Sequence, residues 1–256
     1  MAAITSTHLA DGASDSSLKT FGTEDTKTAT AARAAMKTYS VYFAGGLFDL
    51  RQLHGNAALA AAIERISKGA FSIRLPQNIE IREFDPQQIR DDDFRAVMGS
   101  DLYLGQFDGT ELDSGTVAEF MRAKQADIPA LLLRTDFRSG GDQGQGKDPW
   151  NLMLSHFPRC ETLYVDSMAA YKSELSKDRT PRASLEASQR AIDALAGQII
   201  AKLGVLVASK PVLPRGIQEA VYRGIALTTG FKGGDDEAVA FALEALRQKQ
   251  ERGLLL

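Results

Sequence analysis

The sequence predicts an α/β protein with a doubly wound, mostly parallel five-stranded sheet of the Rossmann-like or flavodoxin-like kind. Helices cover both faces of this sheet, and a helical extension follows it. Two observations predict this class. Short apolar, β-prone segments alternate with helical segments between residues 38 and 165, as in parallel sheets covered by helices. After residue 180, apolar residues recur at helical spacing instead.

The predicted elements follow in a regular order. Tyr39–Ala44 is the first strand and ends at Gly45-Gly46, while Pro76 ends the second strand. The five strands are expected at 39–44, 71–75, 101–107, 130–134 and 162–165, and the helices between them at 50–68, 86–98 and 115–126. Three more amphipathic helices are expected at 184–203, 216–228 and 235–252. The carboxyl ends of parallel strands form one edge, where sites gather.

Three regions are predicted along the chain. Residues 1–37 are rich in Ser, Thr, Ala and Asp, and we expect a disordered extension because such a segment buries too little apolar surface to fold. Residues 38–170 form the α/β domain, and residues 171–256 form the helical extension. Its last residues, Leu254–Leu256, are apolar and are expected to dock on a partner.

Composition excludes several classes of function. The net charge is −3 and the pI is about 5.7, which gives no basic footprint for nucleic acid or an anionic membrane. No apolar run approaches the roughly 20 residues needed to cross a bilayer. Cys160 is the single cysteine, and no Cys/His cluster has zinc spacing. We therefore expect a cytoplasmic protein that uses no metal and no cofactor.

The turn between the third strand and the helix after it is the most informative segment. Asp113 and Glu119 flank this turn, and Gly115 lies between them. Glycine lets a backbone approach a ligand, and a helix N-terminus offers free N–H groups. We expect Glu119 in the first turn of the helix. The two carboxylates either cap that helix or carry out chemistry.

Two other motifs have ordinary explanations. Gly141 to Lys147 has the G-x-x-x-x-G-K spacing of a phosphate-binding loop, but Asp148 stands where Ser or Thr would hold magnesium. We expect a polar loop there. Asp91-Asp92-Asp93 is expected, on the residues alone, to be a solvated acidic patch.

Five motifs in order resemble the nucleoside 2-deoxyribosyltransferase family over about residues 39–155. Asp93 has the family's spacing from Asp101, and Asp113 precedes Glu119 by six positions. The motifs are Val41–Phe48, Leu75-Pro76-Gln77, Asp93, Asp113–Glu119 and Trp150–Leu154. Each motif alone is weak, whereas the ordered set with matching spacing is specific.

The resemblance implies a retaining double displacement at C1′ of a deoxyribose, through a covalent glutamyl-sugar ester. It implies Glu119 as the nucleophile and Asp93 as the acid and base, with a pKa raised by burial or by a nearby carboxylate. Asp113 is expected to bind the sugar hydroxyls. The remaining expected contacts are Tyr42 on Glu119, Gly45 in the glycine turn, Phe48 as an apolar wall, Gln77 at the base edge, and Asn151 in a neighbouring subunit's site.

The expected partners are therefore deoxyribonucleosides and free nucleobases, with neither nucleic acid nor membrane. A homo-oligomer follows from the role that the resemblance gives Asn151. Two alternatives remain open. One is a hydrolase of the same superfamily that acts on a nucleoside or a nucleoside 5′-monophosphate, and the other is a non-catalytic nucleoside sensor. Family members commonly end soon after the last strand, so the extension departs from their pattern and puts a role of the terminal carboxylate in doubt.

Overall fold

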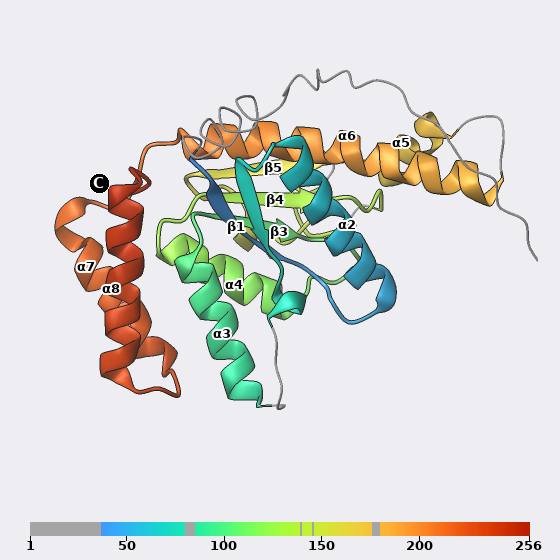
Figure 1. The fold of residues 1–256 in the computed structure, drawn as a ribbon. Coiled ribbons are helices and arrows are strands. Elements are labelled where there is room, and N and C mark those ends of the chain that lie inside the picture. The colour runs from blue at the N-terminus through green and yellow to red at the C-terminus, as the bar shows by residue number, and fades with distance from the viewer. Residues whose placement is uncertain (1–36, 80–84, 139, 145, 176–179) are drawn as a thin grey trace, which may run out of the picture. The chain divides into compact units, whose positions relative to one another are not determined.

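A computed structural model describes residues 37–79, 85–138, 140–144, 146–175 and 180–256 (Figure 1). The predicted disorder of residues 1–36 lies outside this part of the chain. Five strands form one sheet in the order β2-β1-β3-β4-β5, and all four pairings are parallel. The strands are β1 (Tyr39–Ala44), β2 (Phe71–Arg74), β3 (Leu102–Gln106), β4 (Ala130–Arg134) and β5 (Cys160–Tyr164). The predicted fold class is confirmed.

The helices begin where the sequence supplies caps. Asp49 and Gln52 form a reciprocal capping box at the start of α2, and Asp85 caps α3 just before Pro86, an arrangement that satisfies N–H groups left free at a helix start. The α-helices are α2 (Leu50–Ile66), α3 (Pro86–Gly99), α4 (Ser114–Gln125), α5 (Ser167–Glu174), α6 (Pro181–Val207), α7 (Arg215–Thr229) and α8 (Asp235–Glu251), with short 3-10 turns η1 (Pro76–Asn78) and η2 (Leu152–Leu154).

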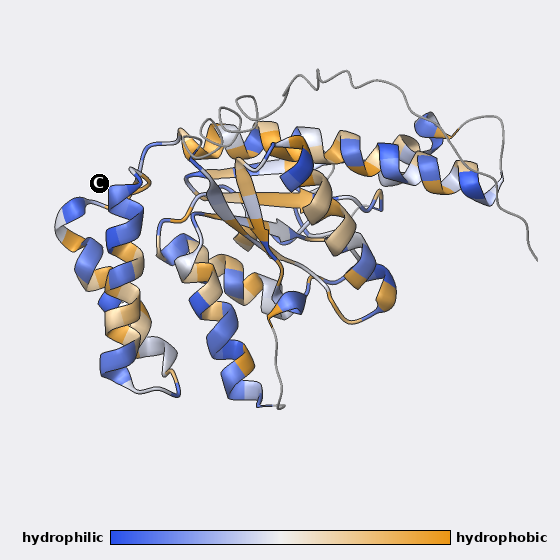
Figure 2. Cartoon of the chain, viewed as in Figure 1, coloured by the Kyte–Doolittle hydropathy of each residue, from blue (hydrophilic) through white to orange (hydrophobic). Residues whose placement is uncertain are grey.

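Each face of the sheet has its own apolar cluster, as Figure 2 shows by the hydrophobic strands between helices with hydrophilic outer sides. Val41 and Leu104 face α2 and α6. Tyr42 and Tyr103 face α3 and α4, where α7 and α8 add further apolar residues. This split follows from the alternation of side chains along a strand.

The strand order reverses between β1 and β3. The chain leaves β1 through α2 toward β2, and it leaves β3 through α4 toward β4, on the opposite face (Figure 1). Right-handed crossovers in opposite directions put these two helices on opposite faces. The loops after β1 and β3 therefore diverge at the carboxyl edge, which is where doubly wound sheets bind ligands.

The extension packs against the helices that cover the sheet, and its residues 252–254 lie at the edge formed by the amino ends of the strands. The Tyr222 hydroxyl of α7 donates a hydrogen bond to the Ala126 carbonyl at 2.9 Å. Arg159, just before β5, donates to the Leu254 carbonyl at 3.0 Å, and Arg252 donates to the Thr38 carbonyl just before β1. Arg252 and Leu254 thus lie near the amino ends of the strands, at the edge opposite to the carboxyl ends where sites gather.

Several expectations need correction. The last strand begins at Cys160, two residues before the predicted start. Helix α5 was not predicted, because none of its residues is buried and so no periodic apolar pattern marks it.

Leu254 and Leu255 are buried in the chain's own core rather than available to a partner, although Leu256 is exposed. Glu119 is the sixth residue of α4 and lies in its second turn, because the Asp113 cap starts the helix at Ser114.

Asp91 departs from the expected solvated patch. It is 2% exposed, accepts hydrogen bonds from Arg90 and from the Lys232 amide, and so ties α3 to the segment between α7 and α8. Among the described residues, no helix has the length and hydropathy that crossing a membrane requires.

Candidate active site

Asp113 ends the loop after β3 and starts α4. One carboxylate oxygen, Oδ2, accepts hydrogen bonds from the Thr116 amide at 2.7 Å and the Thr116 hydroxyl at 2.8 Å. This is the geometry of an N-cap. The capping role is therefore real, and it occupies only one of the two carboxylate oxygens.

Glu119 lies six residues after Asp113, in the second turn of α4, and its side chain reaches Tyr42 of β1. The Tyr42 hydroxyl donates a hydrogen bond to Glu119 Oε1 at 2.7 Å, which is the contact that the sequence predicted. The pKa of Glu119 is raised to about 8, mainly by burial and in smaller part by the charges of Asp93 and Asp113, whereas the bond from Tyr42 opposes the rise. A buried carboxylate held by one strong donor is a functional-site candidate.

Asp93 approaches the same hydroxyl from α3. The pKa of Asp93 is raised to about 6, mainly by burial and in smaller part by the charge of Asp92, whereas the Tyr42 hydroxyl opposes the rise. The predicted direction of this shift is therefore found. Tyr42 is fully buried and links the two carboxylates, which come from α3 and α4, so three elements position one acidic pair.

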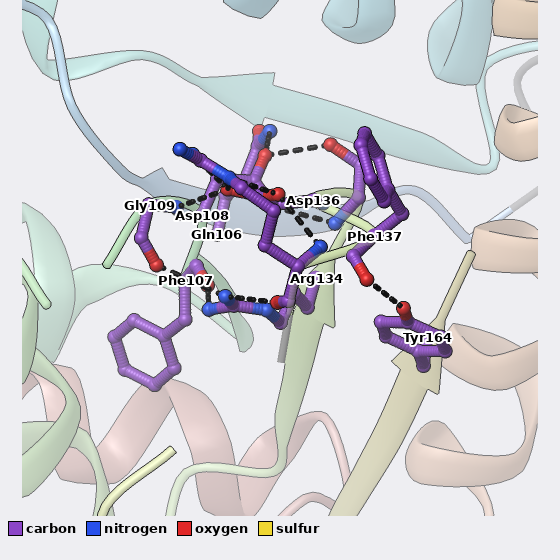
Figure 3. Close-up of polar contacts among 10 residues, drawn as sticks. Gln106, Phe107, Asp108, Gly109, Arg134, Asp136, Phe137 and Tyr164 are labelled. Atoms are coloured by element: carbon purple, nitrogen blue, oxygen red, sulfur yellow. Dashed lines mark hydrogen bonds and ion pairs between the residues drawn. The ribbon is translucent and has the colours of Figure 1, made fainter. Parts of the chain in front are cut away.

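A buried arginine holds the loops beside this pair (Figure 3). Arg134 is 1% exposed and donates to the carbonyls of Phe107, Gly109 and Arg138 at 2.7 to 3.0 Å. These carbonyls belong to the loop after β3 and the loop after β4. The loop that carries Asp113 is thus fixed to its neighbour by the end of β4.

Asp108 strengthens the same connection. Its Oδ1 accepts from the amides of Thr135 and Asp136, and its Oδ2 accepts from the Thr135 hydroxyl and from Gln106 Nε2 at 2.6 Å. Four donors satisfy an ionised carboxylate. We did not predict roles for Gln106 and Asp108, although polar residues directly after a buried strand were an available signal.

The glycine turn after β1 has a steric reason. A Cβ at Gly45 would lie 3.3 Å from the Gln106 Cβ, and a Cβ at Gly46 would lie 2.5 Å from Gln52 Nε2. Phe48, two residues later, is 76% exposed. Gly45 therefore lets the loop pass close to the end of β3, and Gly46 leaves room for the Gln52 side chain that helps cap α2. Phe48 remains free to contact a ligand.

Gln77 and Asn151 lie apart from the acidic pair in the hydrogen-bond network. Gln77 donates to the Leu53 carbonyl at 2.9 Å and accepts from Asn56 at 3.1 Å, so α2 fixes its amide. The Asn151 side chain accepts from the Met153 amide at 3.0 Å. Asn151 and its neighbours Leu152 and Met153 are exposed, so this segment faces away from its own chain's core.

A cavity of about 1130 Å³ opens at the carboxyl edge. Gly46, Phe48, Asp113 and Gln106 line it, together with residues of α2, α5 and α6. Tyr42, Glu119 and Asp93 do not line it, because they lie toward α3 and α4. Asp113 connects the two places, because it lines the cavity and its charge acts on Glu119. Within the described residues, no group of His, Cys, Asp and Glu has the arrangement of a metal site.

In a comparison with known protein families, residues 41–153 match the family model described as Nucleoside 2-deoxyribosyltransferase. No curated protein matches the chain. Similar solved structures include a conserved protein from Enterococcus faecalis V583, with 22% identity and a TM-score of 0.41, covering 65% of this chain and 98% of that one.

Two other similar structures are those of named enzymes. One is a 2-deoxyribosyltransferase from Bacillus psychrosaccharolyticus, with 17% identity and a TM-score of 0.37, covering 50% of this chain and 85% of that one. The other is a Clostridium botulinum CMP N-glycosidase, with 14% identity and a TM-score of 0.37, covering 53% of this chain and 97% of that one.

Proposed function

Residues 41–153 belong to the nucleoside 2-deoxyribosyltransferase family, and from this premise we propose that the protein moves a 2-deoxyribosyl group between nucleobases. The single observation that carries the proposal is the buried Glu119 carboxylate, which accepts a hydrogen bond from Tyr42 at 2.7 Å. Asp93 adjoins the same hydroxyl. The two carboxylates supply a nucleophile and a proton donor, the groups that a retaining exchange at C1′ needs.

In the first half-reaction, an oxygen of ionised Glu119 attacks C1′ and the bond from C1′ to the base nitrogen breaks. Asp93 gives its proton to the departing base. In the second half-reaction, a nitrogen of the incoming base attacks C1′, the ester bond to Glu119 breaks, and Asp93 takes the proton that this nitrogen loses. Two inversions restore the original configuration, and one acid/base residue serves both directions.

The pair holds the required number of protons near neutral pH. With pKa values of about 8 for Glu119 and about 6 for Asp93, one proton remains between them at pH 7, mostly on Glu119. The reactive form carries that proton on Asp93 instead. A nucleobase stacked on Asp93 would exclude water and disfavour its charged form, which raises the pKa of Asp93 relative to that of Glu119. Substrate binding thus shifts the proton toward the reactive arrangement.

The other proposed contacts surround the sugar and the base. Asp113 Oδ1 is the oxygen left for a sugar hydroxyl, since Oδ2 caps α4. Phe48 supplies an apolar wall beside the base, and Gly45 lets the loop pass close to it. Gln77 reads the base edge, and Asn151 reaches the site of a neighbouring subunit in a homo-oligomer.

Charge favours a free 5′-hydroxyl over a 5′-phosphate. Four carboxylates line the cavity, from Asp49, Asp108, Glu111 and Asp113, and Arg51 is the only cation among its lining residues. Arg51 already pairs with Asp49 at 2.9 Å. A dianionic phosphate would meet net negative charge there. This supports the nucleoside transferase over a hydrolase that acts on nucleoside 5′-monophosphates.

One assay tests the proposal. The full-length protein is incubated with deoxyinosine and adenine, and deoxyadenosine and hypoxanthine are followed by chromatography. We expect both products in equal amounts, and no turnover by the Glu119→Ala variant. Hypoxanthine without deoxyadenosine would indicate a hydrolase. Binding without turnover of any base or 5′-phosphate would indicate a sensor and contradict the proposal.

A further inference from the structure

The cavity at the carboxyl edge is built in part by residues outside the family match. Nine of its 24 lining residues follow residue 153, and they come from the end of β5, α5 and α6. We name five of them the α5–α6 subsite: Met168, Tyr171, Ala191, Ile192 and Leu195. The volume of about 1130 Å³ exceeds the roughly 300–1,000 Å³ of ordinary ligand pockets.

We propose that the α5–α6 subsite binds an uncharged, mainly apolar substituent on the nucleobase of the substrate. This inference rests on the proposed nucleoside site and extends it. Gly46 and Phe48, which follow β1, line the cavity, and so does Asp113 at the start of α4. A nucleoside that places its sugar at Asp113 and its base beside Phe48 therefore directs the outer edge of the base toward α5 and α6.

Gln106 provides a second polar contact for that base, besides Gln77. Its amide nitrogen must face Asp108, because an ionised carboxylate only accepts hydrogen bonds, and the contact is 2.6 Å. Asp108 is itself fixed by Thr135 and Asp136 (Figure 3). Gln106 thus keeps one N–H and its carbonyl oxygen for a ligand in the cavity that it lines. A neutral amide of fixed orientation suits the donor and acceptor groups of a base edge.

The chemistry of the lining sets the class of the substituent. The α5–α6 subsite contributes aliphatic, thioether and aromatic surface, and no residue in it is charged. The carboxylates of Asp108, Glu111 and Asp113 lie in the same cavity and disfavour an anion. An aryl or branched alkyl group gains affinity by leaving water for this surface, whereas a carboxylate on the same group loses that gain.

The test compares binding of 2′-deoxyadenosine and its N6-benzyl derivative by calorimetry, with the full-length Glu119→Gln protein so that neither ligand is consumed. We expect the benzyl compound to bind at least about tenfold more tightly, which corresponds to about 1.4 kcal/mol. The N6-(4-carboxybenzyl) compound should lose most of this advantage. Because the readout is binding, it decides the subsite even where the exchange assay shows no transfer.

Two variants locate the effect. Ala191→Trp fills the subsite and should bring the affinity ratio of the benzyl compound to the plain nucleoside close to one. Val205→Trp introduces the same side chain on an exposed part of α6 that does not line the cavity. In this variant the affinity ratio of the two ligands should stay at its starting value. Equal binding of the two ligands to the Glu119→Gln protein, or an unchanged ratio in Ala191→Trp, would overturn the proposal.

Discussion

At the residue scale, one tyrosine hydroxyl connects the two carboxylates on which the chemistry depends. The bond from Tyr42 lowers the pKa of both Glu119 and Asp93, while burial raises both. Burial is the larger effect at each carboxylate, which is why their pKa values stay above the ordinary range for carboxyl groups. The pair is therefore predicted to control how the reaction depends on pH.

We predict a bell-shaped dependence of kcat/KM on pH, with limbs near 6 and 8. Below the first limb both carboxyls are protonated and no nucleophile exists; above the second, both are ionised and no acid remains. In Tyr42→Phe, both limbs should move up by about one unit, because a hydrogen bond to a charged group contributes about 1.5–3 kcal/mol.

Tyr103→Phe is the matched control for this change. Tyr103 stacks on Tyr42 with ring centroids 6.2 Å apart, but its hydroxyl donates to the Thr116 carbonyl at 2.8 Å. Loss of that hydroxyl should leave the limbs in place. A profile that keeps its limbs in Tyr42→Phe, or moves equally in both variants, would contradict the role of Tyr42.

The raised pKa of Glu119 also predicts a cost in stability. The folded protein binds the Glu119 proton more tightly than the unfolded chain does. The stability that this proton gives the fold is therefore fully present below about pH 4.5 and is lost as the pH rises through about 8. Glu119→Gln should therefore be more stable than the wild type at pH 9, by up to about 5 kcal/mol. Urea unfolding at pH 9 and pH 5 measures this; an equal difference at both values would refute it.

At the element scale, the start of α4 combines two functions in one residue. Asp113 caps the helix with Oδ2, and the same cap sets the register that carries Glu119 toward Tyr42. The sequence predicted that the segment from Asp113 to Glu119 is functionally important, but it did not decide whether its carboxylates cap the helix or carry out chemistry. Because an aspartate at a helix start satisfies either role, the residue type alone cannot separate them.

Two substitutions separate the two functions of Asp113. Asp113→Ser keeps a capping oxygen and removes the carboxylate, so stability should stay within about 0.5 kcal/mol of the wild type while KM for the nucleoside rises. Asp113→Ala removes both groups and should cost about 1 kcal/mol in addition. Thermal unfolding and steady-state kinetics check this. An unchanged KM in Asp113→Ser would exclude a contact with the sugar.

The strands and most helices were predictable because burial on both faces imposes apolar runs and caps mark the helix starts. The β4 segment Ala130–Arg134 is buried throughout, and its bounds were predicted correctly. By contrast, α5 has no buried residue and leaves no periodic signal. Gln106 and the α5–α6 subsite were not predicted as parts of a site, because their function depends on which distant segments the fold brings together.

At the scale of the whole molecule, the extension covers both apolar clusters of the sheet. Ile199 and Leu203 of α6 lie in the cluster on the α2 face, and Tyr222 and Leu246 of α7 and α8 lie in the cluster on the α3 and α4 face. Residues 38–256 form one compact unit. Whether residues 38–170 act as a separate catalytic domain stays a prediction.

The shared site is also a prediction at this scale. If Asn151 acts in a neighbouring subunit, Glu119→Gln and Asn151→Ala should each be inactive alone. Mixed by unfolding and refolding together, they should regain up to about a quarter of wild-type activity in a symmetric dimer, because each mixed dimer has one intact site. An exchange assay after mixing measures this. No recovery, in mixtures shown to contain heterodimers, would place Asn151 outside the partner's site.

The central claim is that Glu119 forms a covalent bond to the sugar, and a trapped intermediate tests it most directly. A 2′-deoxy-2′-fluoroarabinosyl nucleoside slows the breakdown of the ester by destabilising the oxocarbenium-like transition state. Mass spectrometry of the digested protein should then find the fluorosugar on the peptide that contains Glu119, and adenine should release it. An adduct on another residue, or turnover of the ordinary nucleoside by Glu119→Ala, would contradict the account.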